Sequence, residues 1–292
     1  MKKILALVLA LTLAFCFCAC AKTENNETTA ADGTADEAAV KTGVEDGVLT
    51  VAMECAYAPY NWSQTDDANG AVPIRDTDEF ANGYDVMMAK KICEANGWEL
   101  EVVRLDWDSL IPAVQTGQVD AVIAGQSMTA DRAEQVDFAG PYLYASIVCV
   151  TLKDSELAEA KSLADFSGHT CTSQLSTIWY DTCLPQIENA DIQPGKESAP
   201  AMLMALETGD VDFICTDMPT AQAAVQAYDD MVLVDLGENG FTVDEGDINI
   251  GVSLQKGNTE LKNKIDGVLS GMTADDFNTI MAEATAIQPV SE

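Results

Sequence analysis

Two charged residues occupy positions from which they could bind the two ends of a small molecule. Arg132 follows the small-residue loop Gly125 to Thr129, and Asp217 ends an apolar run. Thr129 is a good N-cap residue, so Arg132 is predicted to lie in the first turn of a helix. The positive end of the helix dipole disfavours a cation there. Its presence indicates an anionic ligand group, which a planar guanidinium can bind through two parallel hydrogen bonds.

Both residues belong to copies of one pattern. Residues 115–125, QTGQVDAVIAG, match residues 207–217, ETGDVDFICTD, at Thr-Gly and at Val-Asp, and each copy follows an apolar, helix-like segment. In open α/β sheets a ligand binds beyond the carboxyl ends of the strands. The repeat therefore predicts two similar lobes that face each other, one with a cation and one with a carboxylate. A small zwitterion would satisfy both, although helix, glycine turn and strand also recur in α/β proteins of unrelated function.

The length and charge of the chain limit the classes of function. With 292 residues, of which 48% are hydrophobic, the chain is long enough for two domains with separate cores. Its formal net charge of −33 excludes nucleic acid and anionic membrane surfaces as partners of the folded part. The acidic residues are scattered and not grouped at metal-ligand spacing, so we expect neither a metal ion nor a cofactor.

The first residues have the features of an export signal. Lys2 and Lys3 precede the apolar segment 4–17, which is too short for a membrane span. This order of a basic and an apolar region predicts a signal peptide over residues 1–20, and therefore a protein that acts outside the cytoplasm.

A lipid anchor is predicted at the end of this signal. Cys20 follows Ala19, and a small residue before a cysteine resembles the lipobox of bacterial lipoproteins. We therefore expect a lipid (palmitate) anchor on Cys20 that holds the protein at the cell membrane; an ordinary secretory signal is the alternative. Residues 21–44 are polar and acidic, which is typical of a flexible linker.

The cysteines and the histidine do not form a recognisable metal or catalytic motif. His169 is the only histidine, and no cysteine after the signal forms a CxxC pair, so a zinc site is not predicted. A serine or cysteine triad would depend on His169 alone. Cys149 and Cys215 lie in apolar strands, where a thiol is an ordinary core group. The cysteines after the signal are Cys55, Cys93, Cys149, Cys171, Cys183 and Cys215.

Strands and helices alternate along the chain, which favours mostly parallel sheets. The apolar stretch 142–152 predicts a long strand that crosses between the lobes, and 249–254 the return crossing. We therefore expect an α/β fold with lobe 1 over residues 45–144 and 248–292 and lobe 2 over residues 145–247. The other expected elements are strands at 47–52, 99–105, 119–124 and 170–174, and helices at 85–96 and 260–269.

Five segments in unbroken order resemble one protein family. They are GYDVMMAKKI, DWDSLIPAVQTGQVDAVIAGQSMTADR, VDFAGPY, TDMPTA and INIGVSLQKGNTELKNKI, within residues 48–272. They resemble the periplasmic-type solute-binding proteins of ABC importers for polar amino acids. The resemblance implies two lobes with mixed, mostly parallel sheets, joined by two crossover strands and closing like a hinge over one free amino acid. It also implies a monomeric, non-catalytic lipoprotein that delivers the ligand to the permease subunits in the membrane.

The resemblance assigns a role to each matching residue. Arg132 would clamp the ligand α-carboxylate, and Asp217 would take the α-ammonium. The other matching positions would give hydroxyl or backbone contacts, or flank the ligand side chain with aromatic rings. Ordinary packing of the aromatics, and a helix cap at position 177, are the alternatives. These other positions are Ser127, Gly125 and Thr177 for the polar contacts and Tyr57 and Trp107 for the aromatic ones.

The chain also departs from the family pattern at places that affect specificity. Ile178 stands where many relatives have a second hydroxyl residue, and Ser176 replaces the usual glycine. Met87 and Met88 interrupt an acidic pattern, and a polar insertion at 63–82 is expected beside the pocket mouth. None of these departures affects Arg132 or Asp217.

Glu54 is the residue on which the ligand class depends. It stands where binders of basic amino acids carry an acid, so a cationic or polar amino acid is favoured; the alternative is a solvated loop residue. Tyr57 and Trp107 would add cation–π attraction. An acidic ligand is disfavoured because Arg75, in the insertion, is the only other base nearby. Further residues expected in the pocket are Asn61, Trp62 and Gln126.

An enzymatic function is the alternative to binding alone. Cyclohexadienyl dehydratases share the fold that the resemblance implies, and in such an enzyme Glu54 would act as a general acid.

Overall fold

The computed structural model describes residues 44–289. The predicted signal peptide, the anchor at Cys20 and nearly all of the 21–44 linker lie outside the described residues. Within 44–289, no helix has the length and apolar character needed to cross a membrane.

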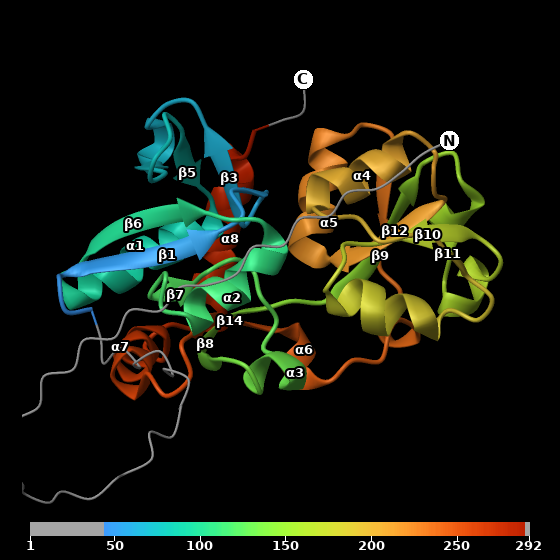
Figure 1. Ribbon diagram of the computed structural model, residues 1–292. Helices are drawn as coiled ribbons and strands as arrows, with labels where there is room; N and C mark the ends of the chain where they lie inside the picture. Colours follow the sequence, from blue (N-terminus) through green and yellow to red (C-terminus); the bar gives the residue numbers. More distant parts are fainter. Residues whose placement is uncertain (1–43, 290–292) are drawn as a thin grey trace, which may run out of the picture. The chain divides into compact units, whose positions relative to one another are not determined.

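The first sheet has the order β6-β1-β7-β14-β8. β1 (Val48–Met53) is parallel to β6 (Glu99–Arg104) and to β7 (Ala121–Val122). β14 (Asn249–Leu254) is antiparallel to β7 and to β8 (Asp137–Tyr144). Four helices accompany this sheet, and we call the unit lobe 1 (Figure 1). They are α1 (Tyr84–Asn96), α2 (Leu110–Gln115), α7 (Thr259–Leu269) and α8 (Ala274–Ile287).

The second sheet has the order β11-β10-β12-β9-β13. β12 (Phe213–Asp217) is central, parallel to β10 (Thr170–Thr172) and antiparallel to β9 (Ile147–Leu152). The edge strands are β11 (Asp191–Ile192) and β13 (Met231–Val234). The helices α4 (Ala199–Glu207) and α5 (Met218–Ala227) pack against this sheet, and we call the unit lobe 2 (Figure 1).

The predicted polar insertion is folded into a third, small sheet. Its antiparallel order is β2-β3-β5-β4. A bridge from Ile74 to Val102 joins it to β6 of lobe 1. The strands are β2 (Ala56–Tyr57), β3 (Asn61–Gln64), β4 (Val72–Pro73) and β5 (Phe80–Asn82).

The chain passes between the two large sheets twice, which confirms the predicted two-lobed α/β fold with mixed sheets. The sheets are not mostly parallel as predicted, because each large sheet has as many antiparallel as parallel strand pairs. The stretch 142–152 is divided between β8 and β9, because the backbone changes partners at Ala145 and Ser146. Ala145 N donates to Ile248 O, and Ser146 O accepts from Met218 N. The return runs through residues 235–248, which include the short helix α6 (Glu245–Ile248). The predicted return crossing at 249–254 is therefore wrong, because that stretch is β14, which pairs with β7 and β8 inside the first sheet. The predicted lobe boundaries, at 144/145 and 247/248, fall at or next to these two connections, and they remain predictions.

The repeat seen in the sequence is present as two similar helix, turn and strand units. α2 is followed by Gly117 with φ +70° and then β7; α4 is followed by Gly209 with φ +74° and then β12. The positive φ explains a glycine at each position. β7 is shorter than the predicted strand 119–124, although Asp120 N and Ile123 N still donate to carbonyls of β1.

The loop after β7 has the predicted cap and a tight packing that was not predicted. The Thr129 hydroxyl accepts a hydrogen bond from Arg132 N at the start of α3 (Ala130–Ala133). Gly125 has φ +64°, and a Cβ built on it would lie 2.8 Å from Tyr57 Cε1 and 3.1 Å from Tyr60 Cδ1. The small loop is therefore approached by tyrosine rings of the same chain.

Replacing Gly125 by Ala should destabilise the protein by about 2–4 kcal/mol. Two costs add: the left-handed backbone conformation is strained for alanine, and the new Cβ would overlap the Tyr57 and Tyr60 rings. Gly209→Ala is the matched control, since φ is also positive there but no atom lies within 4 Å of the added Cβ. Gly209→Ala should lower the unfolding free energy only by the backbone strain, about 1–2 kcal/mol. Urea unfolding of both variants measures the difference. Equal losses would show that ring packing does not require glycine at position 125.

Candidate ligand-binding site

Two adjoining cavities lie where the lobes meet. The inner one has a volume of about 10 Å³, and the outer one about 590 Å³. Trp107, Arg132, Thr177 and Ile178 line both cavities. Most of the predicted site residues therefore meet at one place. The residues that line the inner cavity are Tyr57, Trp107, Gly125, Ser127 and Arg132 from lobe 1 and Gln174, Thr177, Ile178 and Trp179 from lobe 2.

Arg132 bridges the two lobes. Its Nη1 donates to Ser127 O over 3.0 Å, and its Nη2 donates to Ser176 O over 2.9 Å. The guanidinium carbon lies 5.3 Å from the centre of the Trp107 ring, within cation–π range. Burial lowers the pKa of Arg132 to about 10, and Asp181 and Asp247 act in the opposite direction. The group therefore remains a cation at neutral pH.

The loop of lobe 2 that meets Arg132 has an unusual backbone. Ser176 has φ +57°, a conformation that glycine adopts without strain. Its carbonyl accepts hydrogen bonds from Arg132 and, over 3.4 Å, from Trp107 Nε1. The Thr177 hydroxyl donates to Gln174 O over 2.7 Å. The turn thus places its carbonyl and the Thr177 side chain at the wall of the cavity.

Asp217 lies directly behind Tyr57 and does not itself line the inner cavity. Its side chain is 1% exposed, and it caps α5 by accepting from Thr220 N over 2.9 Å. Its Oδ2 accepts from Tyr60 Oη over 2.7 Å and from Tyr57 Oη over 3.2 Å. Burial raises the pKa of Asp217, and these hydrogen bonds act against the rise.

Glu54 is buried, not a solvated loop residue. It is 7% exposed, and neither its Oε2 nor the Nε2 of nearby Gln174 has a hydrogen-bond partner within residues 44–289. Loss of hydration raises the pKa of Glu54 to about 7. The Gln174 amide lowers it, and Asp106 and Asp108 raise it further. Gln174 lines the inner cavity, whereas Glu54 lies beside the Gln174 amide and itself lines neither the inner nor the outer cavity.

A buried carboxylate beneath the site was missed in the sequence. Asp85 is 0% exposed and accepts hydrogen bonds from Tyr142 Oη and Asn61 Nδ2, each over 2.7 Å. The Tyr142 hydroxyl accepts from Gly125 N over 3.0 Å, and Asn61 Oδ1 accepts from Cys55 N over 2.7 Å. Burial raises the pKa of Asp85 to about 7. The loops that carry Glu54 and Gly125 are therefore tied to one carboxylate.

Other residues expected in the pocket lie elsewhere. Asn61 belongs to the Asp85 network, and Trp62 lines a separate cavity of about 380 Å³. Gln126 lines only the outer cavity. Arg75 pairs with Glu101 over 3.0 Å. No residue of the insertion lines the inner or outer cavity, so among the described residues it does not shape the pocket mouth as expected.

The residues that sequence analysis missed here are Tyr60, Gln174, Trp179 and Asp85. The sequence offered one signal for Tyr60: the segment 57–60 has a second tyrosine close to Tyr57, whose hydroxyl could also reach a site residue.

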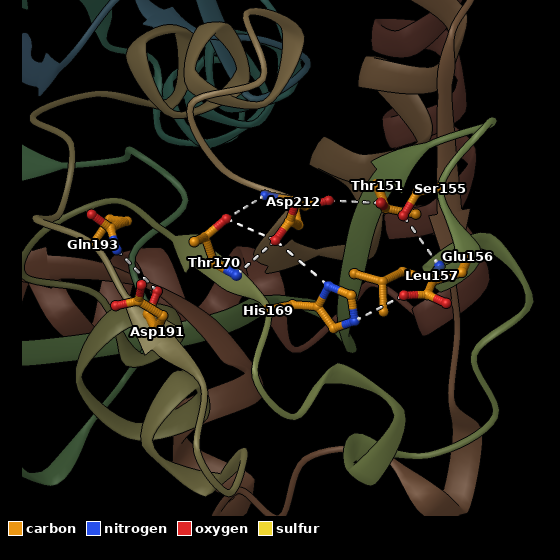
Figure 2. Close-up of polar contacts among 9 residues, drawn as sticks. All are labelled: Thr151, Ser155, Glu156, Leu157, His169, Thr170, Asp191, Gln193 and Asp212. Carbon is orange, nitrogen blue, oxygen red and sulfur yellow. Dashed lines mark hydrogen bonds and ion pairs between the residues drawn. The ribbon is translucent and has the colours of Figure 1, made fainter.

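The histidine and the cysteines take no part in the site. Figure 2 shows His169 between two carboxylates: its Nε2 lies 3.5 Å from Glu156 Oε1 and its Nδ1 3.5 Å from Asp212 Oδ2. Both ring nitrogens thus face acids, so neither is placed to activate a hydroxyl or thiol. Cys149 and Cys215 are buried and free, as expected of core thiols. Over residues 44–289, no group of acids, histidine and cysteines could hold a metal ion.

Two lobes with a charged site where they meet form a cleft suited to binding a small ligand. Residues 49–283 match the model of the bacterial extracellular solute-binding proteins, family 3. The chain belongs to this family.

Known relatives and solved structures agree with that assignment. The chain is 29% identical over 234 residues to a probable histidine-binding protein of Campylobacter jejuni, covering 80% of each chain. It resembles the arginine-bound form of truncated ArgBP from T. maritima with a TM-score of 0.64 and 28% identity, covering 78% of this chain and 97% of that one. It also resembles the ancestral amino acid-binding protein AncCDT-1, a precursor of cyclohexadienyl dehydratase. The TM-score is 0.68 and the identity 26%, and the match covers 83% of this chain and 97% of that one.

Glu54 should make stability depend on pH with a definite sign. An unfolded Glu has a pKa of about 4.3, so a folded pKa of about 7 means that the folded state binds this proton more tightly. The resulting destabilisation is fully present above about pH 7 and is lost as the pH falls toward 4.3. Relative to Glu54→Gln, the wild type should therefore gain about 2 kcal/mol in unfolding free energy between pH 8 and pH 5.5.

Urea unfolding at both pH values measures this difference, and contributions from Asp85 and Asp217 cancel because both proteins carry them. A difference that does not change with pH would mean that the folded Glu54 titrates like an unfolded glutamate.

Proposed function

We propose that this protein is the substrate-binding component of an ABC importer and that its ligand is a cationic amino acid. The observation that carries the proposal is the buried Glu54 with an oxygen that lacks a hydrogen-bond partner within 44–289. A buried carboxylate is costly unless a cation pairs with it. A cationic ligand side chain supplies that partner, and the Gln174 amide beside it adds a polar contact.

The charges of the site fit such a ligand. Arg132 would bind the α-carboxylate, and Asp217 the α-ammonium, which takes the place of the Tyr57 hydroxyl on that carboxylate. Glu54 would bind the charged side chain. One cation and two carboxylates of the protein thus meet one carboxylate and two cations of the ligand, so each of these three protein groups has a partner of opposite charge.

The remaining predicted residues complete the proposed contacts. Tyr57 and Trp107 flank the ligand side chain, and Gly125, Ser127 and Thr177 supply polar contacts from the two lobes. The inner cavity of about 10 Å³ is smaller than an amino acid, so the ligand enters when the lobes are apart. Closure about the two connecting segments then brings both sets of residues onto it.

The wider role follows from the family. We propose that the mature protein acts as a monomer outside the cytoplasm, is held at the membrane through a lipid on Cys20, and passes its ligand to the permease subunits. The family match and the relatives named above support binding and transport over catalysis.

A dehydratase remains the second candidate, because a carboxyl with a pKa of about 7 suits a general acid. Turnover of prephenate or arogenate by the purified protein at a catalytic rate would replace the binding proposal.

A thermal-shift screen against the twenty amino acids, ornithine, citrulline and cystine tests the ligand class. At a concentration roughly 1,000 times Kd, a ligand stabilises the native state by about 4 kcal/mol. We expect shifts with Arg, Lys, ornithine or His. In Glu54→Gln these shifts should shrink as affinity falls roughly 100-fold or more, since one partner of a buried ion pair is lost. Shifts confined to neutral amino acids would support the proposal that the protein binds an amino acid, but would reject Glu54 as the partner of a cationic side chain.

Arg132→Ala should weaken binding of the amino acid found in that screen by several hundredfold or more, because the ligand carboxylate loses its buried partner. Arg132→Lys keeps the charge but not the two-pronged geometry, so it should recover only part of the affinity. Calorimetry measures both variants, and circular dichroism controls for folding. Unchanged affinity in folded Arg132→Ala would mean that another group binds the carboxylate.

A further inference from the structure

Direct hydrogen bonds join the lobes at Asp217. This residue ends β12 in lobe 2, whereas Tyr57 and Tyr60 lie in the β2–β3 segment attached to lobe 1. Both tyrosine hydroxyls donate to Asp217 Oδ2, Tyr60 over 2.7 Å and Tyr57 over 3.2 Å. Because the partners belong to different lobes, these bonds exist only while the lobes are closed.

The two tyrosines differ in their relation to the ligand cavity. Tyr57 lines the inner cavity, and its hydroxyl also accepts a bond from Thr220 Oγ1. Tyr60 is 0% exposed and does not line the cavity. Its ring stacks on Tyr57 at 4.6 Å and meets the Tyr84 ring edge-on at 6.2 Å. Tyr60 thus reaches Asp217 from behind Tyr57, where a ligand in the cavity does not touch it.

The bond from Tyr60 is the stronger of the two. It is short, its acceptor is a carboxylate, and Asp217 is 1% exposed, so water does not replace the hydroxyl in the closed form. Hydrogen bonds to charged groups are the strongest class of protein hydrogen bond. In the open form both groups would return to water, so the bond favours closure over opening.

We propose that Tyr60 is a positioning residue that latches the lobes. Its hydroxyl holds the Asp217 carboxylate in the closed form whether or not a ligand is present, and it keeps that bond when the ligand ammonium displaces the Tyr57 hydroxyl. The latch raises the population of the closed form and orients Asp217 toward the ligand. It depends on lobe closure but not on the ligand being cationic.

Tyr60→Phe isolates the latch, because it removes one oxygen and keeps the buried ring. Tyr84→Phe is the matched control: Tyr84 is equally buried in the same stack, but its hydroxyl donates to Tyr142 O within lobe 1. Spin labels on Lys91→Cys in lobe 1 and Glu188→Cys in lobe 2, both exposed positions, report the lobe separation. The native cysteines within residues 44–289 are buried and so protected from labelling.

Distance distributions should be recorded on protein unfolded and refolded to remove bound amino acid. We expect Tyr60→Phe to lower the ratio of closed to open protein roughly 10- to 100-fold, the range for a lost bond to a charged group. Tyr84→Phe should leave the ratio unchanged. A Tyr60→Phe ratio equal to wild type, or an equal fall in Tyr84→Phe, overturns the latch.

A double-mutant cycle guards against a general loss of structure. If the two side chains act through one bond, the effects of Tyr60→Phe and Asp217→Asn on the ratio should be non-additive. Additive effects reject the latch. Because no ligand is added, the outcome of these measurements does not depend on whether the proposed amino-acid ligand is correct, and the thermal-shift screen tests that ligand separately.

Discussion

The buried carboxylate of Asp85 is the interaction on which the arrangement of lobe 1 around the site depends. It receives hydrogen bonds from Tyr142 on β8 and Asn61 on β3 while it lies in the first turn of α1. Through these two partners it also fixes the amides of Gly125 and Cys55. A buried acid depends on such hydrogen bonds, so loss of any one leaves a buried polar group unsatisfied. Two loops from distant parts of the sequence thus share one electrostatic requirement.

The same physical cause explains the raised pKa values around the cleft. Burial raises the pKa of Glu54 and Asp85 to about 7 each, and it also raises the pKa of Asp217. Asp85 and Asp217 accept several hydrogen bonds, which oppose the rise, whereas Glu54 Oε2 has no partner within residues 44–289. Of the three, Glu54 therefore has the most to gain from a cation. The strongly acidic chain as a whole would also attract cations toward the cleft.

Local patterns in the sequence predicted local structure well. The Thr129 cap, the repeated glycine turns and the helix 260–269 each depend on neighbours in the chain, and each is present. The division of 142–152 between two sheets was not predicted, because an apolar run does not reveal where its backbone changes partners. α8 was also absent from the sequence interpretation, although Thr273 and Asp276 form a capping box at its start.

The site was only partly predictable for a related reason. The family pattern indicated Arg132, Trp107 and Thr177, which do meet at the inner cavity. The bond between Tyr60 and Asp217 joins residues 157 positions apart, and the one between Tyr142 and Asp85 spans 57. Such contacts depend on how the sheets are placed, which spacing within one element does not show. Motifs thus identified groups at the cavity wall better than the groups that hold them in place.

Selectivity must therefore arise at the Glu54 end of the proposed binding mode. Arg132 and Asp217 would recognise a carboxylate and an ammonium, which every free α-amino acid carries, so they cannot distinguish one from another. The ammonium must also displace the Tyr57 hydroxyl from Asp217, so only the difference between those two bonds adds to affinity. At Glu54 the nearby donor is the neutral Gln174 amide, which lowers the pKa of Glu54 but leaves Oε2 without a hydrogen-bond partner within residues 44–289. The full strength of a buried ion pair, less its desolvation, is available there to separate cationic from neutral ligands.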